Sequence, residues 1–349
     1  MTSVRFDNVS IIFGDKPETA LPLVDQGKTR DEIGASTGLV LGVADASLTV
    51  EEGEILVLMG LSGSGKSTLL RAVNGLAPVV RGGVSVQTAN GPVSPYKCSP
   101  KALRDLRMHT VSMVFQQFAL LPWRTVSDNV GFGLELAGVP ETERKKRVGE
   151  QLELVNLTKW ANRKVNELSG GMQQRVGLAR AFATGAPILL MDEPFSALDP
   201  LIRTRLQDEL LEFQRRLKKT ILFVSHDLDE AFRIGNRIAI MEGGRIIQCG
   251  TPQDIVKNPA DQYVADFVQH MNPITMLTAK DVMQPGLSHA AGSTVSATAR
   301  AETPLVDILD ALARQPGSIG VVDNGAVIGT ISAQDIVSGL TRHRRKEQA

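Results

Sequence analysis

The sequence lacks several features that mark whole classes of protein. It has only two cysteines, Cys98 and Cys249, which are too few for a disulfide framework and fit a reducing compartment. Lys and Arg together number 38, as do Asp and Glu, so there is no basic excess of the kind that nucleic-acid binders show. No apolar run approaches about 18 residues, and the first residues lack the apolar stretch of a signal peptide. We therefore expect a cytoplasmic protein that reaches any membrane through a partner.

Short apolar runs alternate with amphipathic segments along most of the chain. The runs lie at Ile55–Met59, Val111–Phe115, Ile188–Met191 and Ile221–Val224. Runs of this length suit strands that are buried on both faces of a parallel sheet. Between them lie segments with the spacing of amphipathic helices, for example Glu143–Leu157 and Ile202–Leu217. The alternation predicts an α/β fold.

The two ends of the chain depart from this pattern. Near the N-terminus, the strand-like stretches Arg5–Phe13 and Val43–Val50 flank a polar, helical insertion from about Asp15 to Gly38. Beyond residue 270, a smaller unit contains an amphipathic helix at Pro304–Ala313 and a hairpin that turns at Asn324–Gly325. We expect a large domain at 1–270 with a helical subdomain at about 117–180, a linker at 271–279, a small α+β unit at 280–342 and a basic tail at 343–349.

A glycine-rich segment at residues 60–68 carries the clearest chemical signal. Its sequence, GLSGSGKST, matches the G-x-x-x-x-G-K-[ST] template, follows an apolar run and precedes an expected helix at Thr68–Val73. Glycines let backbone N–H groups surround phosphate oxygens, the lysine meets the β- and γ-phosphates, and the hydroxyl after it binds Mg²⁺. The alternative is a chance glycine-rich turn, which the flanking strand and helix disfavour. The candidate nucleotide-binding residues are Gly60, Ser62, Gly63, Ser64, Gly65, Lys66, Ser67 and Thr68, with Ser67 also a metal ligand.

Polar residues follow the other three apolar runs, at the strand ends where ligands gather in open parallel sheets. Gln116 can hold Mg²⁺ or the attacking water, and Asp192 is a candidate metal ligand. Glu193 can accept a proton from that water, and His226 can bond the γ-phosphate. Taken alone, Gln116 would be an ordinary loop residue, and His226 would be an ordinary hydrogen-bonded side chain. Beside a phosphate loop, the set predicts a hydrolytic site in which Glu193, His226 and Gln116 are catalytic.

A second glycine pair occurs in LSGGMQQR at residues 168–175, about one helix and one strand before Asp192. Ser169 can cap a helix with an apolar face, and Gly170 and Gly171 leave the first amides of that helix uncovered. These uncovered amides make an anion site. The alternative is an ordinary helix cap.

With DEP at 192–194 and SALD at 196–199, these motifs resemble the ABC ATPase family, and the resemblance covers residues 1 to about 270. It implies a P-loop ABC-type ATPase domain with a mixed sheet and a helical subdomain, acting with ATP and Mg²⁺. In that family, the LSGG signature of one subunit closes over ATP held by the phosphate loop of another. The resemblance therefore implies two copies with two ATP molecules between them. The residues that it adds to the nucleotide site are Ser169, Gly170, Gly171, Gln173 and Asp199.

Within the family, strings such as FALLPWRTVSDNV and SHDLDEAF look closest to the ATPase subunits of bacterial importers for choline, glycine betaine or proline betaine. Choline is our first expectation for the cargo. The resemblance implies a separate transmembrane permease, a periplasmic or extracellular substrate-binding protein that acts through it, and a peripheral position on the cytoplasmic face of the inner membrane. Trp123 and Arg124 are the expected permease contacts, with a packed tryptophan as the alternative. Phe13 is the candidate for stacking on adenine, with a core phenylalanine as the alternative.

Residues 280–342 resemble a single CBS motif that ends in GTISAQD at 329–335. Such motifs often pair, so a second copy of the chain could supply the other. Ser332 and Asp335 match positions that contact ribose in nucleotide-binding examples, and the alternative is a packing or regulatory role without a ligand. The rival to an importer subunit is a soluble ABC-type ATPase that acts on nucleic acid or ribosomes. Such proteins usually carry a second ATPase domain, a long coiled coil or basic arms, which this sequence does not show.

Overall fold

The computed structural model divides the chain into two compact units, Met1–Thr251 and Pro252–Ala349. It describes residues 1–116, 119–196, 198–269, 274, 277–285, 295–323 and 325–346. The division falls before the predicted limit at 270, because the helices at 252–269 group with the second unit. Much of the predicted linker at 271–279 and the end of the predicted tail, residues 347–349, lie outside the described residues. For the rest, the predicted domain limits stay a prediction.

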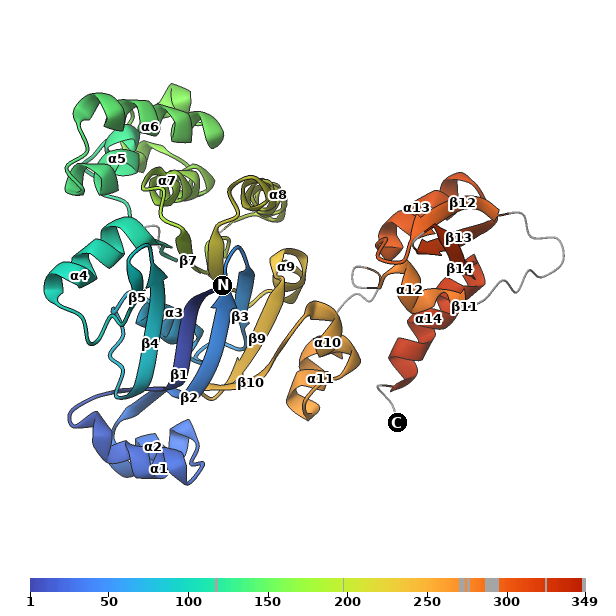
Figure 1. Cartoon of the computed structure of the whole chain (residues 1–349), viewed down its shortest axis with the longest axis horizontal. Helices are drawn as coiled ribbons and strands as arrows, with labels where there is room; N and C mark the ends of the chain where they lie inside the picture. Colours follow the sequence, from blue (N-terminus) through green and yellow to red (C-terminus); the bar gives the residue numbers. More distant parts are fainter. Residues whose placement is uncertain are drawn as a thin grey trace. The chain divides into compact units, whose positions relative to one another are not determined.

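A six-stranded sheet forms the centre of the first unit (Figure 1). In the order β10-β9-β3-β8-β7-β6, it consists of β3 (Ile55–Met59), β6 (Val111–Val114), β7 (Ile188–Asp192), β8 (Thr220–Val224), β9 (Arg237–Glu242) and β10 (Arg245–Gly250). Neighbouring strands are parallel except for β9 and β10. Every residue of β3, β7 and β8 is buried, as their apolar composition predicts. The mixed α/β sheet is thus confirmed, and its parallel strands end at one edge.

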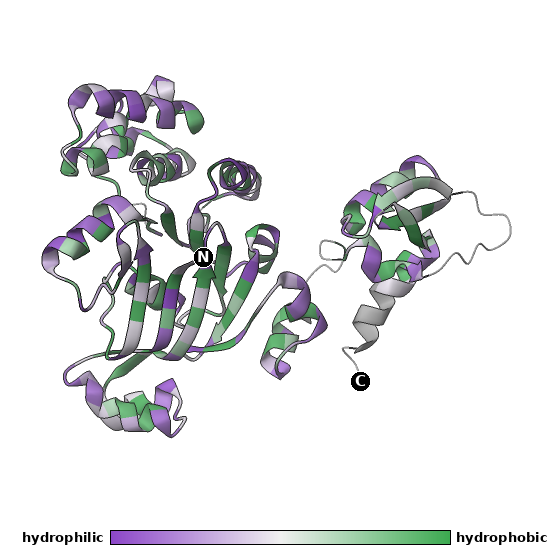
Figure 2. Cartoon of the chain, in the orientation of Figure 1, coloured by the Kyte–Doolittle hydropathy of each residue, from purple (hydrophilic) through white to green (hydrophobic). Residues whose placement is uncertain are grey.

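A second, antiparallel sheet has the order β2-β1-β4-β5. Its strands are β1 (Thr2–Phe13), β2 (Val40–Glu51), β4 (Arg81–Thr88) and β5 (Gly91–Val93). Apolar residues of both sheets form one buried cluster, to which α3 (Lys66–Ala72) contributes Leu69 and Leu70. Figure 2 shows the apolar residues concentrated on these strands. This core fixes the start of α3, where the phosphate loop ends.

The predicted insertion between β1 and β2 is helical, as expected. It forms a 3-10 turn, η1 (Pro17–Ala20), and the helices α1 (Leu21–Asp25) and α2 (Arg30–Thr37). Thr29 and Glu32 cap each other at the start of α2, and Gly38, at φ 71°, ends it.

Helices surround the sheets and build a region with its own apolar core. Its cluster joins α5 (Val126–Leu136), α6 (Glu141–Leu154) and α7 (Gly170–Ala183) within the predicted helical subdomain, whose residues 117 and 118 lie outside the described part. The other elements of the first unit are α4 (Pro100–Asp105), a π-helical turn η2 (Leu106–Thr110), η3 (Thr158–Trp160), η4 (Val165–Glu167), α8 (Pro200–Leu217) and α9 (Leu228–Ile234). A segment of about 20 apolar residues, as a bilayer-spanning helix requires, is not found among the described helices.

The second unit has a four-stranded sheet in the order β11-β14-β13-β12, around which its own apolar core forms. Its elements are α10 (Pro252–Lys257), α11 (Gln262–Gln269), α12 (Ala279–Val282), β11 (Gln284–Pro285), β12 (Val295–Arg300), α13 (Leu305–Arg314), β13 (Ser318–Asp323), β14 (Ala326–Ile331) and α14 (Ala333–Lys346). The Ser332 hydroxyl accepts a hydrogen bond from the backbone amide of Asp335 (3.3 Å), and the Asp335 carboxylate accepts one from the backbone amide of Ser332 (2.8 Å). The two candidate ribose contacts therefore cap α14, and the CBS resemblance stays a prediction.

Candidate nucleotide site

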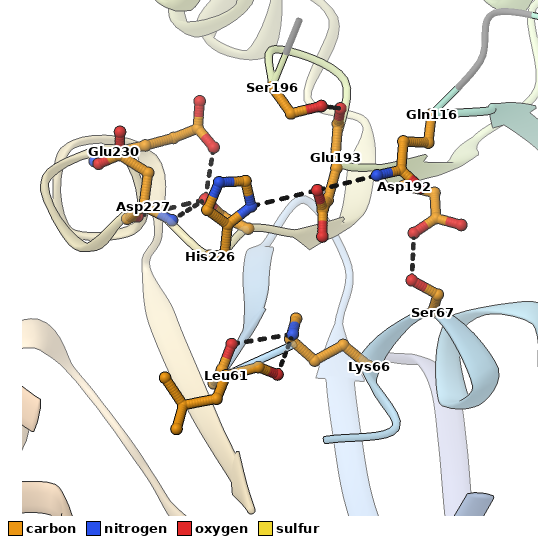
Figure 3. A network of polar contacts seen from close by, with 12 residues as sticks. Leu61, Lys66, Ser67, Gln116, Asp192, Glu193, Ser196, His226, Asp227 and Glu230 are labelled. Atoms are coloured by element: carbon orange, nitrogen blue, oxygen red, sulfur yellow. Dashed lines mark hydrogen bonds and ion pairs between the residues drawn. The ribbon is translucent and has the colours of Figure 1, made fainter. Parts of the chain in front are cut away.

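The phosphate loop joins β3 to α3 and carries Lys66 into the protein. Gly60 and Gly65 have φ angles of 142° and 98°, and a Cβ on either would collide with a backbone carbonyl oxygen of β9 or β2. Only glycine fits both positions. Lys66 is 4% exposed, and its Nζ donates hydrogen bonds of 2.8 Å to the carbonyls of Gly60 and Leu61 (Figure 3). The loop thus holds a buried ammonium group, and the predicted contact of Lys66 with the β- and γ-phosphates stays a prediction.

The ammonium group of Lys66 is buried and lies near two carboxylates, Glu193 and Asp192. Ser64 is buried with its Oγ 3.4 Å from Nζ of Lys66, whereas Ser62 and Gly63 are exposed at the outer side of the loop. Burial lowers the pKa of Lys66, although the negative charges of nearby Glu193 and Asp192 oppose that effect. A phosphate bound in the loop would offset the burial and favour the charged ammonium.

Asp192, the last residue of β7, is fully buried and reaches α3 with both carboxylate oxygens. The Ser67 hydroxyl donates to Oδ1 at 2.6 Å, and Arg71 Nη2 lies 2.9 Å from Oδ2. A hydroxyl and a carboxylate at contact distance are the hard oxygen ligands that Mg²⁺ prefers. The residues present therefore fit the predicted metal.

Glu193 follows Asp192 and is held in a strained conformation, with φ 46°, by a backbone hydrogen bond to Val224 on β8 (3.2 Å). Its side chain meets the other two predicted catalytic residues. Gln116 Nε2 donates to Oε2 of Glu193 at 3.1 Å, and His226 Nδ1 lies 3.1 Å from the same oxygen (Figure 3). The ends of β6, β7 and β8 thus bring Gln116, Glu193 and His226 together, as predicted.

A buried polar network lies behind His226 and orients its loop. The Ser225 hydroxyl donates to Glu230 at 2.5 Å, and Gln207 of α8 donates to the other oxygen of that carboxylate at 3.0 Å. Glu230 is 6% exposed, and burial raises the pKa of its carboxyl. Arg203, also on α8, bonds Asp227 at 2.8 Å. Helix α8 therefore positions the segment that carries His226.

The LSGG segment forms the start of α7, as predicted. Ser169 caps the helix and accepts a hydrogen bond from the amide of Met172 (3.4 Å), while the Gln173 side chain donates to the carbonyl of Leu168 (3.1 Å). A Cβ built on Gly170 would meet nothing within 4 Å, so packing within the chain does not require glycine there. Space in front of this helix terminus is compatible with an anion from outside the chain. The predicted contact of Ser169, Gly170, Gly171 and Gln173 with nucleotide stays a prediction.

Asp199 caps α8 in this structure, with its carboxylate accepting from the amide of Ile202 at 3.0 Å. Ser196, at the start of the same loop, donates to the backbone carbonyl of Glu193 at 3.1 Å. Residue 197 lies outside the described residues. The loop is therefore attached to the segment of Glu193 at one end, and the predicted place of Asp199 in the nucleotide site stays a prediction.

The structure bears on the two aromatic candidates. Phe13, the last residue of β1, is 38% exposed, and its ring lies beside Gly42, where a Cβ would be 2.9 Å from the ring and 3.1 Å from the Thr68 methyl. Phe13 is therefore near the end of the phosphate loop rather than in the core, although its stacking on adenine stays a prediction. Trp123 is 70% exposed, which rules out the packed tryptophan.

Sequence reasoning missed three arginines that bond to site segments. Arg71 pairs with Asp192, Arg203 bonds the loop of His226, and Arg30 bonds the phosphate loop. Arg71 follows Ser67 by four residues and so lies on the same face of α3, a spacing that could have identified it. The other two come from distant segments, for which the sequence offers no comparable signal.

Comparisons with known proteins agree with this geometry. A family model described as ABC transporter matches residues 43–196. ProV of Escherichia coli (strain K12), a glycine betaine/proline betaine transport system ATP-binding protein, is 50% identical over 279 residues, which cover 80% of this chain and 69% of ProV. TmoW of Ruegeria pomeroyi, a trimethylamine N-oxide transport system ATP-binding protein, is 45% identical over 340 residues, or 96% of each chain.

The solved structures of MJ0796, a bacterial ABC transporter cassette, have the same fold. Two of them align with this chain at 30% identity and TM-scores of 0.60 and 0.59, covering 71% of this chain and 98% of MJ0796. Both are dimeric, and one is a post-hydrolysis state bound to ADP and Pi. The resemblance predicted from the motifs is thus confirmed, and the chain belongs to the ABC transporter family as an ATP-hydrolysing, ATP-binding subunit.

Proposed function

We propose that this ATPase powers the import of a small N-methylated zwitterion through a separate membrane permease. The observation that carries the hydrolytic half of this proposal is the convergence of Gln116, Glu193 and His226 beside Lys66 and the Ser67–Asp192 pair. The import half rests on ProV and TmoW, which belong to transport systems for such compounds.

In the proposed hydrolysis, Glu193 takes a proton from the attacking water. The hydrogen bonds from Gln116 and His226 both end on Oε2. Within the described part of the chain, no hydrogen bond occupies Oε1 of Glu193, so this oxygen is the one that can accept the water proton. Gln116 and His226 keep the carboxylate oriented, and the strained backbone of Glu193 fixes its position.

The same site suits the predicted magnesium ion. Ser67 and Asp192 would hold it, with Gln116 as the further candidate ligand, and the ion would supply positive charge against the β- and γ-phosphates. Arg71 orients the Asp192 carboxylate through the oxygen that Ser67 does not contact. Lys66 needs only to exchange its two carbonyl partners for phosphate oxygens.

We infer that a second copy of the chain completes each site. The uncrowded face of Gly170 can receive an anion that another molecule presents, and MJ0796 forms dimers. Closure of two copies would place Ser169 of one over the phosphate loop of the other. The exposed Trp123 lies in the segment that follows Gln116, where a permease could respond to the state of the site.

The names of the relatives bear on the cargo. Glycine betaine, proline betaine and trimethylamine N-oxide each join a cationic methylated nitrogen to a negatively charged oxygen, whereas choline lacks the negative oxygen. We therefore place a zwitterion ahead of choline, our first expectation from the sequence. The zero formal net charge and the import-system relatives also favour this function over action on nucleic acid or ribosomes.

Reconstitution tests this assignment. The chain would be purified with the membrane proteins that accompany it in a pull-down and placed in vesicles with an added substrate-binding protein. ATP-dependent uptake of labelled glycine betaine or trimethylamine N-oxide, lost with Glu193→Gln, is expected. If only choline is taken up, choline is the cargo and the proposed zwitterion is not. Absence of a membrane protein in the pull-down would refute the import function, and co-purified RNA or ribosomes would favour the rival.

A further inference from the structure

The insertion between β1 and β2 is a rigid addition to the antiparallel sheet. It packs its apolar side chains against that sheet in a cluster of buried residues, namely Ile12, Ala20, Val24, Ile33, Leu39, Leu41 and Ala44. The reciprocal cap between Thr29 and Glu32 fixes the start of α2. Side chains on this first turn are therefore held in a defined place.

Ion pairs attach the insertion to the rest of the first unit. Arg81 of β4 binds Asp25 of α1 at 2.6 Å and Asp45 of β2 at 2.5 Å. Arg245 of β10 donates to the carbonyl of Val24 at 3.1 Å and lies 3.4 Å from the same Asp45. Two strands thus hold α1 directly, β4 through Arg81 and β10 through Arg245, and Asp45 of β2 pairs with both arginines.

Arg30, the first residue of α2, extends from this addition to the phosphate loop. Its Nε donates to the carbonyl of Leu41 on β2 at 2.6 Å, and its Nη1 donates to the carbonyl of Gly63 in the loop. A cation in the first turn of a helix is opposed by the helix dipole. The position of Arg30 is thus explained by the two carbonyls that it joins rather than by the stability of α2.

We propose that Arg30 is a positioning residue of the nucleotide site, which holds the phosphate loop in its binding conformation before ATP arrives. Because a peptide group is planar, fixing the Gly63 carbonyl also fixes the following N–H group, which closes the turn of the loop onto the carbonyl of Leu61 (3.2 Å). Gly60, Gly63 and Gly65 give this loop unusual conformational freedom, so a tether reduces the entropy lost on binding.

Loss of Arg30 should affect the binding of ATP but not its hydrolysis. Arg30 has no contact with Glu193, His226 or Gln116 in the described part of the chain, so its loss leaves the geometry of proton transfer intact. A loosened loop weakens the binding of ATP and leaves turnover at saturation unchanged. The insertion then contributes to ATP binding through Arg30.

Variants of the full chain test this role. Arg30→Ala should raise the Kd for a fluorescent ATP analogue with Mg²⁺, and the KM for ATP, roughly tenfold, since hydrogen bonds from a charged donor are lost. The value of kcat should stay within about twofold. Arg30→Lys, which keeps the charge but not the two-armed geometry, should lie between Arg30→Ala and wild type. Lys28→Ala is the matched control, because it removes an exposed charge of the same insertion, whose ion pair within the described residues is with Glu32 at 2.8 Å.

An Arg30→Ala variant with the wild-type KM would overturn the proposal, as would a fall in kcat at unchanged KM. If Arg30→Ala does not fold, Arg30→Lys decides, because a wild-type KM in that variant excludes a dependence on the bridging geometry. These measurements use ATP alone, so they are independent of which cargo the transporter carries.

Discussion

Replacing Glu193 with glutamine should keep the hydrogen bonds of the site and remove its proposed general base. Oε2 of Glu193 accepts the bonds of both Gln116 and His226. A carboxamide can place its oxygen at this position and keep both bonds. Its NH₂ group then stands where Oε1 was and cannot accept a proton. Glu193→Gln should therefore fold and bind ATP as the wild type does, while losing the base.

The expected loss follows from the contribution of a positioned base. Removing it should lower kcat by about 100- to 10,000-fold, or about 3 to 5 kcal/mol in activation free energy. Steady-state phosphate release measures kcat, a fluorescent ATP analogue measures binding, and light scattering with ATP and Mg²⁺ should show a dimer that persists. Glu242→Gln, at the exposed end of β9, is the control. A folded Glu193→Gln variant that retains kcat within about tenfold of wild type would refute the assignment.

Two further changes probe the surroundings of the site. Because burial raises the pKa of Glu230, the folded chain keeps a proton that the unfolded chain releases, so the free energy of unfolding should fall as pH rises from near 4.5 through the raised value. Glu230→Gln should flatten this dependence in urea titrations, with exposed Glu212→Gln as control; equal slopes would contradict the argument. Trp123→Ala should leave basal hydrolysis unchanged and remove most of the stimulation by the permease in vesicles, and full stimulation would disprove the contact.

The parallel sheet was predictable because its strands are buried on both faces and therefore consist almost entirely of apolar residues. Ile55–Met59 is a strand with the predicted limits. The last helix extends to Lys346, within the predicted basic tail, because a polar stretch carries no apolar pattern that would mark where a helix ends. The assembly of β1, β2, β4 and β5 into a separate sheet was not predicted, since pairing of strands far apart in sequence leaves no local signal.

The site residues that closely follow a strand could be predicted from the sequence. Gln116, Glu193 and His226 were placed together from the rule that parallel strands end at one edge, and their contacts follow it. The contacts of Arg30 and Arg203 depend on where an insertion and a helix lie in three dimensions. Such contacts are decided by tertiary packing, so they appear only in the structure.

Gly65 and Gly170 differ in what surrounds them: Gly65 is enclosed by backbone of its own chain, and Gly170 faces open space. A side chain at Gly65 would strike the backbone of the chain itself, while one at Gly170 would project into open space. In a mutational scan that scores protein abundance and transport separately, substitutions at Gly65 should deplete both scores, whereas those at Gly170 should deplete only transport. Abundance data alone would therefore miss the proposed contact of Gly170 with a nucleotide.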